Sequence, residues 1–557
     1  MYANTNMAAE SYRDIQKSFI SNLNGTTALE ISVVTSVAPF SVILRSLIWQ
    51  LLAGNRQKLE GIFSISGIFV VEFITLIIPM FLIFTFLANY AFIFITILVL
   101  LTTTGLVFFN SKQNMTVPAP ILNTKKRFLY NFRAYVNIAT AISILAVDFT
   151  IYPRRFAKTE TYGTGLMDVG VGSFIIANSV VCQDARGTVT TLSFVKAVKK
   201  ELRAVLVLLA LGLVRFIAVK TTDYQEHVSE YGVHWNFFLT LACVRVFSTI
   251  ILRTLPESLG KYPWVIGLLI GLIYQSFLVN GLEEFVVNGS KGDGSRSNFI
   301  DANREGIASS FGYLSLYFIG ISIGRIIFHR KDNCSNSLVN LLLSLICVSL
   351  LCWFILWYWG NKTNPERIIS RRLANFPFVL WQVGYNVLLM TLLLAVDVVV
   401  VVFVPTQAFL RYSGGCWSCS VPSTAPQEQS TESSQPVQNW RIENLTQDSS
   451  HRRQSHKGGE ESSQNTDVNY AYEKTELPVT KAGTGKNVSG CACLLSAVNY
   501  NLLAYFLLAN ILTGIVNLSL ETIHASPIIA LVIMNIYLLT LHAAITVFYK
   551  HNILLKL

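Results

Sequence analysis

Charged residues are scarce in this chain. Asp, Glu, Lys and Arg make up 13% of its 557 residues, whereas 52% are hydrophobic, and the mean hydropathy is +0.48. Soluble globular domains carry about 25% charged residues, so the composition excludes a soluble protein and predicts a polytopic membrane protein. The net charge of +11 is spread over many loops. Because no basic stripe on a soluble face is visible, we expect no nucleic-acid partner.

The sequence also shows no pattern typical of a disulfide framework, a cleavable signal peptide or an internal repeat. The nine cysteines lie mostly in or beside apolar segments, with no spacing typical of a disulfide framework. Cys416 and Cys419, and Cys491 and Cys493, stand at the two ends of one polar segment, where a zinc site, acylation and inert thiols all stay open. Residues 1–23 are polar, so we expect no cleavable signal peptide. No internal repeat is visible, which argues against a secondary transporter.

Long apolar runs dominate what is present. Runs of about 18 or more apolar residues can cross a bilayer as helices, and these runs are too long for barrel strands. We therefore predict an all-α polytopic membrane protein with about 13 transmembrane helices. The predicted spans are residues 28–53, 62–86, 88–109, 135–152, 165–183, 202–220, 236–256, 263–281, 306–328, 337–359, 375–403, 496–518 and 526–549.

Basic residues set the predicted orientation, because Lys and Arg collect in cytosolic loops. The connections between spans 3 and 4, 5 and 6, and 9 and 10 are basic. This pattern places the N-terminus in the lumen and the C-terminus in the cytosol. Two predicted lumenal loops, which contain Arg154 and Arg371, break the pattern.

The chain divides by composition into four parts. Residues 1–27 are predicted to be a lumenal segment, 28–412 a membrane domain of about 11 spans, and 491–557 the last two spans. Residues 413–490 are rich in Ser, Gln, Thr, Glu and Asn. We predict that they form a disordered cytosolic loop that the chemistry does not need.

The densest cluster of charge is DFTIYPRRFAKTE, residues 148–160, between two apolar runs. Charge at the edge of hydrocarbon is costly and usually functional. Asp148, partly buried at the end of a span, could act as a general base. Arg154, Arg155 and Lys158 could stabilise an oxyanion or a phosphate. A structural ion pair at a helix end explains the same residues equally well.

Two further polar segments fall on the same predicted side. Residues 223–238 carry Glu226, His227, Glu230 and His234, whose spacing is compatible with a metal cluster, a substrate contact or an interfacial cap, although Gly232 would interrupt a helix. A glycine-rich loop at residues 292–307 contains two further candidates for binding a polar headgroup, or is simply a turn. The two candidates are Asn303 and Arg304.

Four strings in these regions resemble the inositol acyltransferases of glycosylphosphatidylinositol-anchor synthesis, the class W protein of animals and its fungal counterpart. They are SNLNGTT (21–27), AVDFTIYPRRFAKTETYGTGLMDVGVGSF (146–174), YQEHVSEYGVHWNFF (224–238) and DANREGI (301–307). The resemblance implies an endoplasmic-reticulum membrane enzyme that moves a fatty acyl chain, typically palmitoyl, from acyl-CoA to the inositol 2-hydroxyl of glucosaminyl-phosphatidylinositol. It also implies that residues 28–412 are catalytic, with acyl-CoA as a co-substrate and no other cofactor.

The resemblance assigns the catalytic pair to Asp148 and Lys158, both of which match. Our hypothesis makes Asp148 the base, while Lys158 stabilises the oxyanion or orients Asp148. His234 is the second candidate base. The expected substrate-binding set is Arg154, Arg155, Glu160, His227, His234, Asn303 and Arg304. An acyl-enzyme is disfavoured because no cysteine or serine in the three polar segments lies beside a clear base, although Ser229 and Ser173 leave this alternative open.

Two other function classes compete with this hypothesis. A transporter or flippase for a lipid headgroup would use the same charges as a binding site. A non-catalytic assembly factor would leave the placement of Asp148 and Lys158 unexplained.

Overall fold

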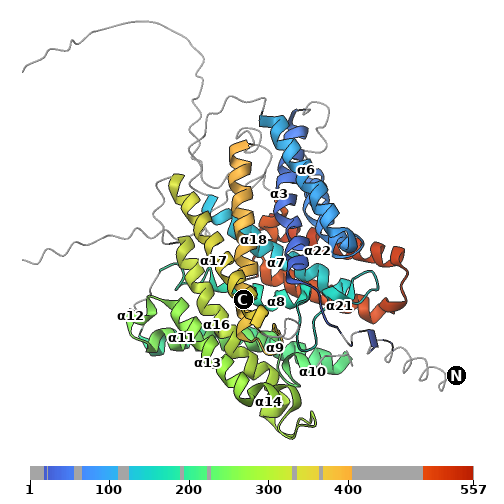
Figure 1. Cartoon of the computed structure of the whole chain (residues 1–557). Coiled ribbons are helices and arrows are strands. Elements are labelled where there is room, and N and C mark those ends of the chain that lie inside the picture. The colour runs from blue at the N-terminus through green and yellow to red at the C-terminus, as the bar shows by residue number, and fades with distance from the viewer. Residues whose placement is uncertain are drawn as a thin grey trace, which may run out of the picture. The chain divides into compact units, whose positions relative to one another are not determined.

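The fold is helical, as the composition predicts (Figure 1). The computed structural model describes residues 15, 18–19, 21, 23–54, 65–110, 124–187, 193–222, 228–328, 335–362, 368–403 and 493–555. Within these ranges there is no strand, and one isolated bridge joins Thr26 to Thr164. The predicted loop at 413–490, His227, Cys416, Cys419 and Cys491 lie outside the described residues.

Ten helices in the described part of the chain are long and apolar enough to cross a membrane. They correspond to ten of the predicted spans, so the polytopic membrane class is confirmed, but the number thirteen is not. They are Ala28–Leu52, Ser66–Phe84, Ala88–Phe108, Phe237–Thr254, Pro263–Asn288, Arg304–Phe328, Leu338–Lys362, Phe376–Val400, Leu502–Ser519 and Pro527–Lys550.

The three other predicted spans differ from the structure. Helix α7 (Thr124–Ala146) begins and ends earlier than the span predicted at 135–152. Helix α8 (Val169–Ser179) has 11 residues, so it rises about 16 Å, too little to cross a hydrocarbon core of about 30 Å. Helix α9 (Phe194–Thr222) covers the span predicted at 202–220 but is not among the ten.

Helix α18 (Phe376–Phe403) organises the helical core. It packs against α3 (Val37–Gly54), α7, α8, α16 (Arg304–Phe328) and α17 (Ser335–Lys362). Figure 1 shows it in orange between the blue N-terminal helices and the yellow-green α16 and α17. Helix α8 approaches α18 closely at Gly172, where a Cβ atom would lie 2.3 Å from the Gln382 Oε1 atom. This contact agrees with a helix-packing role for that glycine.

The C-terminal helices belong to the same core. They are α20 (Leu494–Tyr500), α21 (Leu502–Ser519) and α22 (Pro527–Lys550). All three contact α7, and the Tyr537 hydroxyl donates a hydrogen bond to the Ala141 carbonyl of α7 at 3.0 Å. Residues that follow the long polar segment in sequence therefore help to build the centre of the molecule.

The remaining helices flank this core. They are α2 (Ala28–Thr35), α4 (Ile65–Glu72), α5 (Ile78–Phe84), α6 (Ala91–Asn110), α10 (Val228–Tyr231), α11 (Phe237–Thr254), α12 (Glu257–Gly260), α13 (Pro263–Phe277), α14 (Glu283–Asn288) and α15 (Phe299–Ala302). Helices α11 and α9 pack on one another, as do α13 and α16.

Candidate active site

The segment that joins α7 to α8 folds back over the end of α7. The chain leaves the helix after Ala146, and Asp148 stands in the turn that follows. The Arg154 guanidinium closes this turn by donating to the carbonyl of Val147 at 2.7 Å and to that of Tyr152 at 3.2 Å. Burial lowers the pKa of Arg154 to about 10, so the side chain is still cationic at neutral pH. Arg154 therefore shapes the turn that presents Asp148.

The N-terminal residues hold the next part of this segment. Gly25 has a φ of +78°, and the Thr26 amide donates to the Thr164 carbonyl at 2.6 Å. Thr164 returns a short hydrogen bond from its hydroxyl to the Thr26 carbonyl. Thr27 then caps α2 by accepting a hydrogen bond from the Glu30 amide. The SNLNGTT string is thus a clamp on the loop that carries Lys158.

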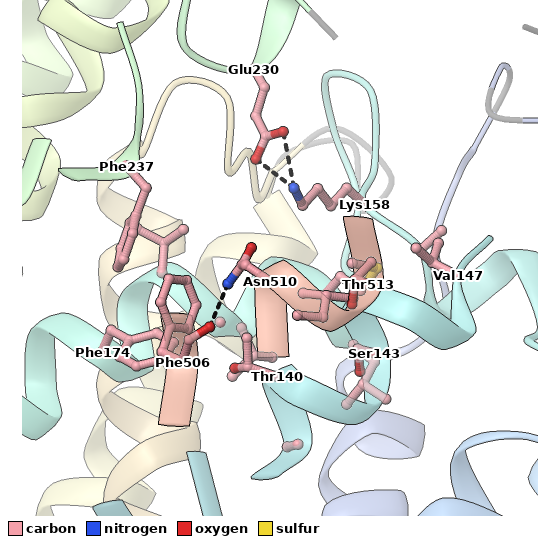
Figure 2. Close-up of a pocket in the computed structure, with 18 of the residues that line it drawn as sticks. Thr140, Ser143, Val147, Lys158, Phe174, Glu230, Phe237, Phe506, Asn510 and Thr513 are labelled. Carbon is pink, nitrogen blue, oxygen red and sulfur yellow. Dashed lines mark hydrogen bonds and ion pairs between the residues drawn. The ribbon is translucent and has the colours of Figure 1, made fainter. Parts of the chain in front are cut away.

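A cavity of about 930 Å³ lies beside this loop. One face of α7, from Tyr135 to Ile144, lines it. The rest of the wall includes residues of α8, α9, α10, α11, α18 and α21. Figure 2 shows Lys158 at one side and an aromatic group at another. In that group the Phe506 ring lies 5.5 Å from the Phe174 ring between centroids, and Phe237 packs against both. The cavity therefore combines ionic and apolar walls.

Asp148 lines the cavity, and a residue from the far end of the chain holds it there. The Asn517 Nδ2 atom donates a hydrogen bond to the Asp148 Oδ2 atom at 2.8 Å. Burial raises the pKa of Asp148 to about 6, and the Asn517 hydrogen bond and the charges of Arg154 and Lys158 oppose the rise. An oriented carboxylate with this pKa is deprotonated at neutral pH and still able to accept a proton.

Lys158 also lines the cavity, but its hydrogen-bond partner is Glu230 rather than Asp148. The Lys158 Nζ atom lies 2.7 Å from Glu230 Oε1 and 2.9 Å from Oε2 (Figure 2). Arg371 bridges Glu230, at 3.2 Å, to the buried Asp168, at 2.7 Å. Burial raises the pKa of Glu230, but the positive charges of Lys158 and Arg371 outweigh it and lower the pKa to about 2. Glu230 is therefore a permanent anion that aims Lys158.

The loop that carries Lys158 is fixed through Asp168. That carboxylate accepts hydrogen bonds from the Thr159 amide and hydroxyl and from the Gly165 amide. Lys158 is thus restrained twice, through its own ion pair and through the backbone of the following residue.

The other predicted site residues fall into two groups. Arg154 and Glu160 line the cavity. Arg155 lies outside it and forms an ion pair with Glu30 at 3.0 Å. His227 lies outside the described residues, so the proposed cluster around it is incomplete, and no other group of three possible metal ligands occurs among the residues that the structure describes.

Residues of the polar segment 292–307 contact the polar segment 223–238 and do not line the cavity. The Asn303 side chain accepts a hydrogen bond from the His234 amide at 2.8 Å, and the His234 ring stacks at 6.2 Å on Phe299. Arg304 is 2% exposed and donates to the carbonyl of Val286 and to Asp301. Neither His234, Asn303 nor Arg304 lines the cavity. His234, Asn303 and Arg304 therefore make hydrogen-bond and packing contacts outside the cavity that Asp148 lines.

Three residues of the site were not predicted from the sequence as site residues. Asn517 sits in an apolar helix and gave no signal. Asp168 lay within a recognised string but carried no distinguishing pattern. Arg371 did give a signal, because it breaks the positive-inside pattern, and the structure accounts for it as the partner of two carboxylates. Basic residues in a predicted lumenal loop can therefore mark an internal ion network.

The fold and the cavity define a multi-pass helical membrane protein with a tuned carboxylate and an anchored lysine in one cavity. The sequence assigns the protein to one family within this class. The GWT1 family model matches residues 12–548, and the chain belongs to this family. The resemblance read from the four strings is thereby confirmed.

Curated relatives cover from about two thirds of the chain to nearly all of it. "Glucosaminyl-phosphatidylinositol-acyltransferase PIGW" of Homo sapiens is 30% identical over 95% of this chain and 96% of the relative. "GPI-anchored wall transfer protein 1" of Gibberella zeae is 31% identical over 98% of this chain and 99% of the relative. The protein of the same name from Saccharomyces cerevisiae is 32% identical over 68% of this chain and 81% of the relative.

Proposed function

We propose that this protein is an O-acyltransferase that moves a palmitoyl-type acyl chain from acyl-CoA to the inositol 2-hydroxyl of glucosaminyl-phosphatidylinositol. The observation that carries the proposal is the pairing of an oriented, proton-accepting Asp148 with a cationic Lys158 in one cavity among membrane helices. The name of the human relative supports glucosaminyl-phosphatidylinositol as the acceptor. The relatives support a location in the endoplasmic-reticulum membrane. The distribution of basic residues among the loops supports an N-terminus in the lumen and a C-terminus in the cytosol.

The residues suggest a direct transfer. Asp148 accepts the proton of the inositol hydroxyl while the oxygen of that hydroxyl attacks the carbonyl carbon of the thioester. A carbon–oxygen bond forms, the carbon–sulfur bond breaks, and the CoA thiolate leaves. The thiolate then takes the proton from Asp148, which restores the carboxylate and gives free CoA and the acylated lipid.

The cations stabilise the charge that develops in this step. Lys158, held by Glu230, is the donor for the oxyanion of the thioester carbonyl. Arg154 offers a second donor, because its Nη1 atom is buried without a hydrogen-bond partner in the described residues and the side chain lines the cavity. We assign Arg154 to an oxyanion or to a substrate phosphate.

The test is a transfer assay with radiolabelled palmitoyl-CoA and glucosaminyl-phosphatidylinositol on the purified protein. We expect labelled lipid from the wild type and a loss of about 100-fold or more in Asp148→Asn and Lys158→Ala, since general-base and oxyanion contributions are each of that order. Asp293→Asn, an exposed carboxylate outside the cavity, should retain activity.

The same assay can reject the proposal. If well-folded wild-type protein binds the lipid but yields no product, the headgroup transporter becomes the better assignment. A fully active Asp148→Asn would instead remove Asp148 from the role of base.

A further inference from the structure

Two arginines lie near enough to repel one another electrostatically, and the first of them belongs to the end of α7 that lies away from Asp148. Arg133 lies one helical turn before Val136, on the face that continues through Thr140 to Val147. The second arginine, Arg186, follows α8. From Arg133 to the end of α7 the helix rises about 20 Å. Arg133 is therefore well separated from Asp148 but lies on the face of α7 whose later residues line the cavity.

These two arginines have no acidic partner among the residues that the structure describes. The Nε atoms of Arg133 and Arg186 are both buried without a hydrogen-bond partner. Their positive charges act unfavourably on one another. Asp184, the nearest acid in sequence, is within 3.7 Å of Arg253 instead. The Arg186 guanidinium also lies over the Phe328 ring, 5.6 Å from its centroid.

Such an arrangement is costly unless an anion completes it. A partly buried guanidinium is normally paired, and two like charges side by side add repulsion to the desolvation penalty. Phosphate groups match the planar fork of arginine donors and carry enough negative charge to neutralise two of them. The arginines of the catalytic network show the contrast, since Arg371 meets two carboxylates.

We propose that Arg133 and Arg186 form a phosphate-binding site. Two sources share the chemistry: the phosphates of a coenzyme A donor, and the headgroup of an anionic membrane lipid. The coenzyme A source rests on the proposed function. It would place the phosphates at the arginine pair and the thioester near Asp148, with the long pantetheine arm lying along the α7 face past Thr140 and Ser143, whose hydroxyls suit its amide groups.

This placement bears on how the donor reaches the site. In the predicted orientation the beginning of α7 is cytosolic and Asp148 is lumenal. A donor bound in this way would enter from the side where acyl-CoA is made, without crossing the membrane as a whole molecule.

The experiment measures binding of free coenzyme A to full-length protein in nanodiscs of phosphatidylcholine alone. Arg133→Gln and Arg186→Gln should each raise the dissociation constant about tenfold or more, the usual effect of losing a hydrogen bond to a charged group. Pantetheine, the same arm without phosphates, should bind all variants alike. Lys199→Gln, which removes an exposed cation close to the start of α9, serves as the matched control.

A second arm identifies the source of the phosphate. The same variants are placed in nanodiscs that contain phosphatidylinositol, and the lipid that stays bound is counted by native mass spectrometry. Unchanged coenzyme A affinity with reduced bound phosphatidylinositol would assign the site to a lipid headgroup. If neither ligand responds to either substitution, in variants that melt like the wild type, the site does not exist.

The two proposals can fail separately. Loss of coenzyme A binding in the arginine variants, combined with a wild type that transfers no acyl chain, would keep the site and reject the function. If the wild type transfers the acyl chain, but the substitutions change neither coenzyme A binding nor lipid binding, the function is kept and the phosphate site is rejected. Arg133→Lys, which keeps the charge but loses the fork, should recover part of the affinity.

Discussion

At the scale of single residues, the contact between Asn517 and Asp148 joins positions 369 apart in the chain. The amide fixes the carboxylate and, by donating to its charged form, opposes the rise in the pKa of Asp148 that burial causes. A base must be deprotonated to act, so activity should fall as the pH drops through about 6, the pKa of Asp148. The pH dependence of kcat/KM measures this limb directly.

Asn517→Leu should move that limb to higher pH. Loss of a hydrogen bond to a charged group is worth about 1.5–3 kcal/mol, which corresponds to a shift of roughly one to two pH units. Activity should therefore be low at neutral pH and recover in alkaline buffer. Asn535→Leu in α22, whose amide donates only to its own helix, is the control. An equal loss at every pH would show that Asn517 has a purely structural role.

Glu230 supports a second prediction at this scale. Glu230→Gln leaves Lys158 and Arg371 without their shared carboxylate in a partly buried network, and the loss of hydrogen bonds to a charged group costs about 1.5–3 kcal/mol. We expect a lower melting temperature and a drop in kcat of about tenfold or more, with KM less affected, because Lys158 is no longer aimed. Glu230→Asp should recover part of the activity. Glu201→Gln, which breaks a pair with Arg245 outside the cavity, should leave kcat unchanged.

At the scale of elements, the connection between α7 and α8 depends on its clamp. A Cβ atom on Gly25 would lie 2.3 Å from the Thr164 carbonyl oxygen, and the φ of +78° is strained for other residues. Gly25→Ala should cost on the order of 1–3 kcal/mol and reduce transfer by displacing the loop that carries Lys158. Gly260→Ala, where a Cβ would meet nothing within 4 Å, should match the wild type in thermal melting and in activity.

At the scale of the whole molecule, the last helices complete the site. Residues 1–412 expressed alone should be inactive, because α20, α21 and α22 pack on α7 and supply Asn517. Co-expression of residues 1–412 with residues 491–557 should restore activity, since our proposal gives no chemical role to 413–490. Transfer activity and co-purification of the two pieces measure this. A pair of pieces that associates but stays inactive would show that the intervening segment is needed.

The sequence alone determined the class of protein and the region of the site. Apolar runs report the transfer of side chains into lipid, which depends on each segment by itself. Ten of the predicted spans accordingly fall on described helices that are long and apolar enough to cross a membrane. Local patterns failed at α8, which a short 3₁₀ helix (Leu166–Asp168) precedes and turns follow. They also failed at α7, which extends through Lys125 and Arg127 and stops at Ala146. Charge beside hydrocarbon also singled out Asp148, Arg154, Lys158 and Glu160, and all four line one cavity in the structure.

Only the tertiary structure decided which groups meet there. It paired Lys158 with Glu230, turned Arg155, His234, Asn303 and Arg304 away from the cavity, and brought Asn517 to Asp148. Hydrogen bonds and ion pairs depend on distances of about 3 Å, and these distances are set by how helices from separate parts of the chain pack. No local property of the sequence contains that information.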